Sequence, residues 1–216
     1  MDKLSITLDG KAGVGKTTLA EKLSTSLNLS HIETGLIYRA VALLCIEKKF
    51  DIDSTETKTV INSIDIRIRN SKTFVLNDNK TINEIELRSK EIEKFVGKIA
   101  GHEQLRSLIQ KKIVNLSGKY IRVIVVGRQT YKLFPSANMH IFLDASIENR
   151  VYRRAKEFNR SIEEEFMLIT NRDNFIESLL IDVDKNKFCY IDNSNMTIEE
   201  TVDRILKHLR RRGLGC

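Results

Sequence analysis

Residues 4–17 read Leu4-Ser5-Ile6-Thr7-Leu8-Asp9-Gly10-Lys11-Ala12-Gly13-Val14-Gly15-Lys16-Thr17. From Gly10 onward the run matches the phosphate-binding pattern G-x-x-x-x-G-K-[ST], whose glycines let backbone N–H groups surround phosphate oxygens. A strand-like apolar run precedes the loop, and an amphipathic helical stretch with Leu19, Leu23 and Leu27 on one face follows it. The positive end of that helix attracts the same anion. We therefore expect a nucleoside triphosphate to bind at this loop.

The residues of the loop have separate expected roles. Lys16 would reach the β- and γ-phosphates, and the Thr17 hydroxyl would occupy one coordination position of Mg²⁺. Asp9 has two open interpretations: it holds a Mg²⁺-bound water or orients the attacking oxygen, or it forms the turn before a glycine. The residues predicted to bind ATP are Gly10, Lys11, Ala12, Gly13, Val14, Gly15, Lys16, Thr17, Thr18, Arg150 and Arg154.

The composition is that of a folded globular enzyme. The chain has 216 residues, of which 41% are hydrophobic and 30% charged, enough to bury a sizeable core as one α/β domain or as one domain with a small insertion. No apolar run approaches the length of a membrane span, and Asp9 interrupts the apolar stretch near the N-terminus, so no signal peptide is predicted. Three cysteines without histidine pairs argue against a zinc site or a disulfide framework. We expect a cytoplasmic protein.

The net charge of +7 raises the question of a polyanionic partner. Most basic residues alternate with acids, and the one clear cluster, Lys207–Arg212, lies where a helix C-terminus favours positive charge. No ladder of aromatic and basic side chains suggests stacked bases. We therefore predict small-molecule substrates with no nucleic-acid or membrane partner. Because no heptad or exposed apolar stripe stands out, we also predict a monomer.

Strand-like and helix-like segments alternate along the chain with one interruption. Near residues 63–87 apolar side chains recur with period two, which predicts a small antiparallel β insertion. Elsewhere, buried runs such as Ile121–Val126 and Met139–Leu143 alternate with helical stretches, which predicts a parallel sheet flanked by helices, with ligands at the carboxyl ends of its strands. The predicted divisions are a core of about 1–60 and 100–216, a β-rich insertion of about 61–99 and a short lid of about 157–180.

Three arginines are candidate phosphate clamps. Arg39 lies one turn into a helix that opens at Gly35, and Arg128 follows a buried strand, an unusual place for a charge unless an anion binds there. Arg172 lies in a polar, mobile-looking stretch near residues 159–174 and is either a lid residue or a solvated surface residue. Phosphoryl transfer requires cations around both phosphates. The candidate catalytic residues are Lys16, Arg128, Arg172 and Asp9.

Several further motifs occur in one order over almost the whole chain: Glu33-Thr34-Gly35-Leu36-Ile37-Tyr38-Arg39, Glu86-Leu87-Arg88-Ser89, Val126-Gly127-Arg128, Phe134-Pro135 and Ile141-Phe142-Leu143-Asp144-Ala145-Ser146. With Ile6–Gly10 and the phosphate loop they resemble the bacterial cytidylate (CMP) kinases. The resemblance implies a P-loop kinase with a core, an NMP-binding insertion and a short lid, which converts ATP and (d)CMP to ADP and (d)CDP with Mg²⁺. The acceptor-binding residues it implies are Thr34, Tyr38, Arg39, Gly97, Arg106, Arg128, Gln129 and Arg172.

The chain departs from that family pattern on the side of the acceptor nucleoside. Where the family has Asp-Gly-Arg-Asp, this chain has Val126-Gly127-Arg128-Gln129, so an acid near Mg²⁺ and one near the nucleoside are replaced. Gly97 stands where a serine would help to read cytosine, whereas Arg106 is retained. After Arg172-Asp173, the run Asn174–Leu180 lacks a ribose-binding aspartate and a second lid arginine.

Three hypotheses remain open from the sequence. The first is a CMP kinase in which Gln129 and Arg106 still read the base. The second is a kinase of the same fold that acts on a different phosphorylated or phosphonylated acceptor, with the apolar lid patch Phe175-Ile176 and Leu179-Leu180 lining its pocket. The third is a catalytically weak nucleotide-binding protein, which Val126 favours and the intact phosphate loop opposes.

Overall fold

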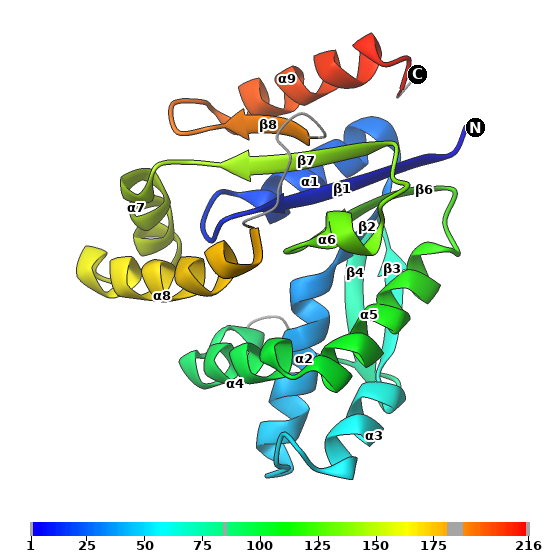
Figure 1. Cartoon of the computed structure of the whole chain (residues 1–216), viewed down its shortest axis with the longest axis vertical. Coiled ribbons are helices and arrows are strands. Elements are labelled where there is room, and N and C mark those ends of the chain that lie inside the picture. The colour runs from blue at the N-terminus through cyan, green and yellow to red at the C-terminus, as the bar shows by residue number, and fades with distance from the viewer. Residues whose placement is uncertain (1, 84–85, 181–187, 215–216) are drawn as a thin grey trace. The chain divides into compact units, whose positions relative to one another are not determined.

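A computed structural model describes residues 2–83, 86–180 and 188–214 (Figure 1). The side chains of Arg88, Lys90, Arg172 and residues 174–180 lie outside that description. The chain forms two compact units, one of Met1–Leu29 with Arg122–Cys216 and one of Ser30–Ile121. In the part of the chain described here, no helix combines the length and apolar character needed to cross a membrane.

The first unit is built on parallel strands in the order β6-β1-β7-β8. Strand β1 (Leu4–Gly10) pairs with β6 (Arg122–Val126) on one side and with β7 (Met139–Asp144) on the other, and β8 (Phe188–Asp192) pairs with β7. The strands are largely apolar and buried, as strands covered on both faces must be. The predicted parallel sheet is confirmed, and the carboxyl ends of its strands meet at one edge.

The helices of this unit pack on the sheet or follow its carboxyl edge. They are α1 (Lys16–Leu27), α6 (Thr130–Leu133), α7 (Ile147–Phe158), α8 (Ile162–Leu180) and α9 (Ile198–Arg211). Leu19, Leu23 and Leu27 of α1 are buried in the same core cluster as strands β1 and β7, so the predicted inner face of this helix is confirmed. Helix α9 begins with a capping box between Thr197 and Glu200, which stabilises its first turn.

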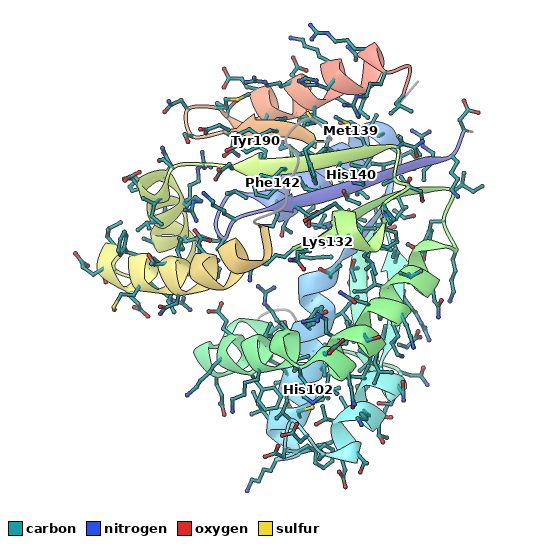
Figure 2. All side chains as sticks on the ribbon, in the orientation of Figure 1. His102, Lys132, Met139, His140, Phe142 and Tyr190 are labelled. Carbon is teal, nitrogen blue, oxygen red and sulfur yellow. The ribbon has the colours of Figure 1, made fainter. Side chains whose placement is uncertain are left out.

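One face of this sheet carries aromatic side chains. His140 and Phe142 on β7 and Tyr190 on β8 are labelled in Figure 2. Phe142 and Tyr190 stack with ring centroids 5.8 Å apart, and Phe188 packs on Phe142 edge-to-face at 6.5 Å. His140 Nδ1 lies 2.8 Å from the hydroxyl of Thr7 on β1. Neighbouring strands are therefore tied together by side chains as well as by their backbones.

The second unit contains the predicted antiparallel insertion. Strands β3 (Asp65–Arg69), β4 (Lys72–Asn77) and β5 (Lys80–Thr81) form a sheet in that order. The Thr73 hydroxyl donates to the His31 carbonyl and accepts from the Glu33 N–H, both at 2.8 Å, which ties β4 to β2 (Ser30–Glu33). The other elements are α2 (Thr34–Glu47), α3 (Thr55–Ser63), the 3₁₀ turn η1 (Glu86–Arg88), α4 (Lys90–Gly101) and α5 (Glu103–Ser117). The division into core, insertion and lid stays a prediction.

The polar stretch near residues 159–174 lies largely within helix α8, which begins at Ile162 and ends at Leu180. The role of this stretch as a mobile lid stays a prediction. Three successive glutamates in its first turn, Glu163–Glu165, suit the positive end of a helix. Glu165 is fully buried and accepts hydrogen bonds of 2.8 Å from both Arg154 and Arg160. Glu165 is therefore paired with two arginines in the packed protein.

Candidate active site

The phosphate loop, Gly10–Thr17, joins β1 to α1 at the carboxyl edge of the sheet. Gly10, Gly13 and Gly15 have φ angles of 154°, 77° and 89°, a region that side chains rarely adopt. A Cβ at Gly10 would overlap the Leu143 carbonyl oxygen of β7, and one at Gly13 would lie 3.0 Å from the Arg154 Cδ. The glycines therefore allow both the turn and its close packing against neighbouring backbone.

Lys16 is directed back over its own loop. Its Nζ donates hydrogen bonds to the carbonyl oxygens of Gly10 at 2.7 Å and Lys11 at 2.6 Å. Helix α1 begins at the same point, and its cap residue, Gly15, supplies no side chain to the first N–H groups. An ammonium group and a helix N-terminus thus converge at the loop, and together they form a strong attraction for phosphate.

Asp9 is a buried anchor for the loop that follows β6. Its carboxylate oxygens accept hydrogen bonds from the Thr130 N–H at 2.8 Å, the Thr130 hydroxyl at 2.9 Å and the Tyr131 N–H at 3.0 Å. Burial raises the pKa of Asp9, whereas these donors and Lys16 oppose the rise. The contacts hold the start of α6, and so fix the preceding residues Arg128 and Gln129. Gln129 itself has a positive φ of 61°.

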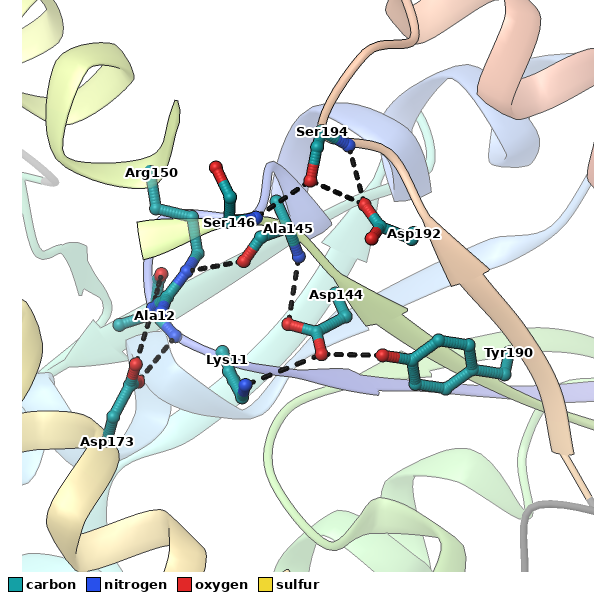
Figure 3. Close-up of polar contacts among 10 residues, drawn as sticks. All are labelled: Lys11, Ala12, Asp144, Ala145, Ser146, Arg150, Asp173, Tyr190, Asp192 and Ser194. Carbon is teal, nitrogen blue, oxygen red and sulfur yellow. Dashed lines mark hydrogen bonds and ion pairs between the residues drawn. The ribbon is translucent and has the colours of Figure 1, made fainter. Parts of the chain in front are cut away.

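Arg150 and Asp173 brace the phosphate loop from α7 and α8 (Figure 3). Arg150 is 3% exposed, and its Nη1 donates to the Asp173 carboxylate at 2.5 Å and to the Ala12 carbonyl at 3.1 Å. The other Asp173 oxygen accepts from the Ala12 N–H at 3.3 Å. Arg150 thus supports the loop through the backbone of Ala12. The contacts of Arg150 and Arg154 with ATP stay predictions, and Arg154 here bonds Glu165.

A second polar network lies at the ends of β7 and β8 (Figure 3). Asp144 and Asp192 are register partners on these strands. The Lys11 ammonium lies 3.4 Å from Asp144 Oδ2, and the Tyr190 hydroxyl donates to the same oxygen at 2.6 Å. Asp192 accepts from the Ser194 backbone and hydroxyl, and hydrogen bonding from Ser194 lowers the pKa of Asp192.

The second unit carries most of the predicted acceptor residues. Thr34 is buried at the start of α2, and Tyr38 lies one turn later on the same helix. Burial raises the pKa of Tyr38 to about 12, and the charge of Arg106 opposes that rise. Arg106 donates to the Ala100 carbonyl at 2.9 Å, and Arg39 lies 4.0 Å from a Glu33 carboxylate oxygen. Gly97 is exposed on α4, and a Cβ added there would have no atom within 4 Å.

The remaining predicted residues lie in the first unit. Arg128 is exposed between β6 and α6, next to Gln129. Arg172 belongs to helix α8, and its side chain lies outside the described residues. Within residues 2–83, 86–180 and 188–214, no three His, Cys, Asp or Glu side chains form a ready-made metal site.

The sequence predictions missed three residues that shape the loop. Asp173 binds Ala12, Tyr190 binds Asp144, and the buried Asn193 donates to the Val14 carbonyl at 3.0 Å. Asn193 directly follows the last strand, so its place at the carboxyl edge was a usable signal. Asp173 and Tyr190 lacked such a signal, because their partners depend on helix packing and strand register.

A model of the cytidylate kinase family matches residues 6–211. A cytidylate kinase from Clostridium botulinum (strain Loch Maree / Type A3) is 34% identical over 220 residues, covering 98% of this chain and 100% of the relative. One from Mycoplasma capricolum is 31% identical over 224 residues and covers 98% of each chain.

Two solved structures share the fold at low sequence identity. An uncharacterized protein from Eubacterium ventriosum has a TM-score of 0.56 at 12% identity and covers 97% of this chain and 99% of its own. A gluconokinase from Sinorhizobium meliloti has a TM-score of 0.50 at 15% identity and covers 97% and 93%.

Proposed function

The chain belongs to the cytidylate kinase family, and on that premise we propose that it transfers the γ-phosphoryl group of ATP to the phosphate of CMP or dCMP. The products are ADP and CDP or dCDP. The observation that carries the proposal is the phosphate loop, in which the Lys16 ammonium and the start of α1 converge. The full-length similarity to kinases named for cytidylate supports the choice of acceptor.

The donor side follows from the contacts of the loop. ATP phosphates entering the loop would take over the Lys16 bonds now made to the Gly10 and Lys11 carbonyls. An ammonium group binds an anionic phosphate more strongly than a neutral carbonyl, so the exchange is favourable. When bound, Mg²⁺ would neutralise phosphate charge, and Thr17 is the residue proposed to hold it. Asp9, whose oxygens already bond Thr130 and Tyr131, is proposed to reach the ion only through a bound water. The brace of Arg150 and Asp173 keeps the loop in shape during the exchange.

The acceptor side depends on cations and on the retained base-side residues. Arg39, Arg128 and Arg172 are proposed to grip phosphates, and Arg106 and Gln129 to contact the base. Asp9 supports this role indirectly, because its bonds to Thr130 and Tyr131 fix the loop that carries Arg128. Transfer then requires an acceptor oxygen in line with the γ-phosphorus, held by charges that also stabilise the transition state.

A second candidate is a kinase of the same fold with a different phosphorylated or phosphonylated acceptor. The observation that favours it is Val126, which is 2% exposed at the end of β6 and leaves an apolar side chain where the family resemblance implies an acid. Gln129 and Gly97 likewise replace an acid and a serine that the family resemblance implies for contacts with the nucleoside. Loss of polar contacts to a substrate changes selectivity by orders of magnitude.

The test is coupled ADP release from ATP-Mg²⁺ with CMP, dCMP, UMP, AMP and a set of small phosphorylated and phosphonylated metabolites. Turnover that is fastest with CMP or dCMP supports the proposal. Turnover with a non-nucleotide acceptor alone would replace it by the second candidate. No turnover with any acceptor, at intact ATP binding, would point to a weak nucleotide-binding protein.

We further propose a cytoplasmic monomer that has no nucleic-acid or membrane partner. The interleaved charges and the absence of an apolar heptad in the sequence support this proposal. Light scattering of the purified protein, with and without ATP and CMP, measures the mass directly. A mass of twice the chain, 24.9 kDa, would contradict the monomer.

A further inference from the structure

Lys11 makes a loose ion pair next to the triphosphate site. Its ammonium lies 3.4 Å from Asp144 Oδ2, and the two side chains are 27% and 16% exposed. The backbone carbonyl of Lys11 accepts a hydrogen bond from Lys16 at 2.6 Å. The side chain of Lys11 thus pairs with the Asp144 carboxylate (Figure 3), while its backbone carbonyl binds Lys16, the central lysine of the loop.

Asp144 has stronger partners than Lys11. Tyr190 donates to the same oxygen at 2.6 Å, and the Ala145 N–H donates to the other oxygen at 2.9 Å. Burial and the carboxylate of Asp144 raise the pKa of Tyr190, so its hydroxyl stays protonated and remains a donor. Asp144 therefore keeps two hydrogen bonds when Lys11 leaves it.

A partly exposed ion pair of this kind contributes little, whereas a lysine bonded to phosphate contributes more. We propose that Lys11 leaves Asp144 for a phosphate of bound ATP, and that Tyr190 is the positioning residue that lets it leave by keeping Asp144 hydrogen-bonded. The inference rests on the proposed function only in requiring that ATP occupy the loop. It gives the loop a second mobile cation beside Lys16.

The proposal predicts opposite signs for two neighbouring substitutions. Asp144→Asn frees Lys11 and tightens ATP binding about two- to fivefold. Tyr190→Phe removes the competing donor, strengthens the hold of Asp144 on Lys11 and weakens ATP binding by a similar factor. Lys11→Met weakens binding about tenfold. A general loss of structure would move the first two variants in the same direction.

The measurement is calorimetric binding of ATP, ADP and adenosine at low salt, without an acceptor. The effects should be greatest with ATP and absent with adenosine. Phenylalanine at position 190 can keep the ring stack on Phe142, and thermal unfolding checks that each variant is folded. Lys22→Met is the matched control, because Lys22 pairs with Glu199 at 2.9 Å on the surface of α1.

The double variant Lys11→Met with Asp144→Asn separates this exchange from simple charge repulsion. If Asp144 acts through Lys11, adding Asp144→Asn to Lys11→Met gives no gain in ATP affinity. A gain that persists in that background overturns the proposal, as does tighter or unchanged binding in Tyr190→Phe. A failed CMP assay with the predicted pattern of ATP affinities would reject the acceptor assignment and leave the exchange supported.

Discussion

The carboxylate of Asp173 accepts a hydrogen bond from the backbone N–H of Ala12 at 3.3 Å, across 161 residues of chain. The same carboxylate binds the buried guanidinium of Arg150, which in turn donates to the Ala12 carbonyl. The backbone N–H and the carbonyl of Ala12 are therefore both held by the ion pair of Arg150 and Asp173. The shape of the loop depends on α7 and α8 as well as on its glycines.

Removal of Asp173 tests this brace. Asp173→Ala leaves Arg150 buried without its carboxylate, and we expect the free energy of unfolding to fall by about 3 kcal/mol. ATP affinity falls with it, because Ala12 loses its support. Urea unfolding and calorimetric titration measure the two effects. Asp173→Asn keeps an oxygen that can accept from the Ala12 N–H, so its stability and ATP affinity should lie between those of the parent and of Asp173→Ala. An Asp173→Ala variant as stable as the parent would contradict the role of Asp173 as a brace.

Substitution of Lys16 tests the donor site. Lys16→Ala removes the ammonium group that faces the loop carbonyls, and we expect turnover to fall at least about a hundredfold with the fold intact. Steady-state kinetics and circular dichroism measure the two properties. Lys22→Ala, on the same helix, is the control for the loss of a lysine. Turnover unchanged in Lys16→Ala would refute the assignment of the phosphate loop.

The lowered pKa of His140 leads us to expect that the stability of the protein depends on pH. Burial lowers its pKa below the ordinary value of 6.5, so the folded protein binds this proton less readily than the unfolded chain. The contribution to stability is complete above 6.5 and is lost as the pH falls through the lowered pKa of the folded state. In His140→Gln, which can still bond the Thr7 hydroxyl, the loss between about pH 7 and about pH 5 should be smaller. Urea unfolding across that range measures it, and equal slopes in both proteins would exclude His140 as the cause.

Two substitutions test whether the altered nucleoside contacts limit the use of CMP. Gly97→Ser places a hydroxyl on α4, where no atom lies within 4 Å of the added Cβ, and Gln129→Asp restores an acid beside Arg128. We expect kcat/KM for CMP to rise in the double variant. Serine in place of a helical glycine also stabilises the helix by about 0.5 kcal/mol. A more stable protein with unchanged CMP kinetics would favour a different acceptor.

The features that the sequence predicted are those set by short-range pattern. The glycine spacing of the phosphate loop, the buried strands predicted at Ile121–Val126 and Met139–Leu143, and the period-two insertion each depend on a few neighbouring residues. Their side chains are dictated locally, by backbone conformation or by burial on both faces. The prediction of a parallel sheet, with ligands expected at the carboxyl ends of its strands, followed from them.

The features that the sequence did not predict depend on partners far along the chain. In a polar stretch of sequence, Glu165 has the pattern of a solvent-exposed residue. In the folded protein, however, it forms ion pairs with Arg154 and Arg160. Tyr190 reads as an ordinary strand residue, and only the register of β7 and β8 brings its hydroxyl to Asp144. Charge pairing across elements leaves no periodic signal, so these contacts could not be read from local pattern.

Gly10 has a consequence for how this protein can vary. A side chain there would collide with the Leu143 carbonyl of the adjacent strand, whether or not ATP ever binds. Purifying selection on this codon would therefore persist in a descendant that had abandoned catalysis, because any replacement would separate two central strands. In a related sequence, a glycine at position 10 therefore indicates only that the sheet can form. A lysine at position 16 is the better indicator that kinase activity has been kept.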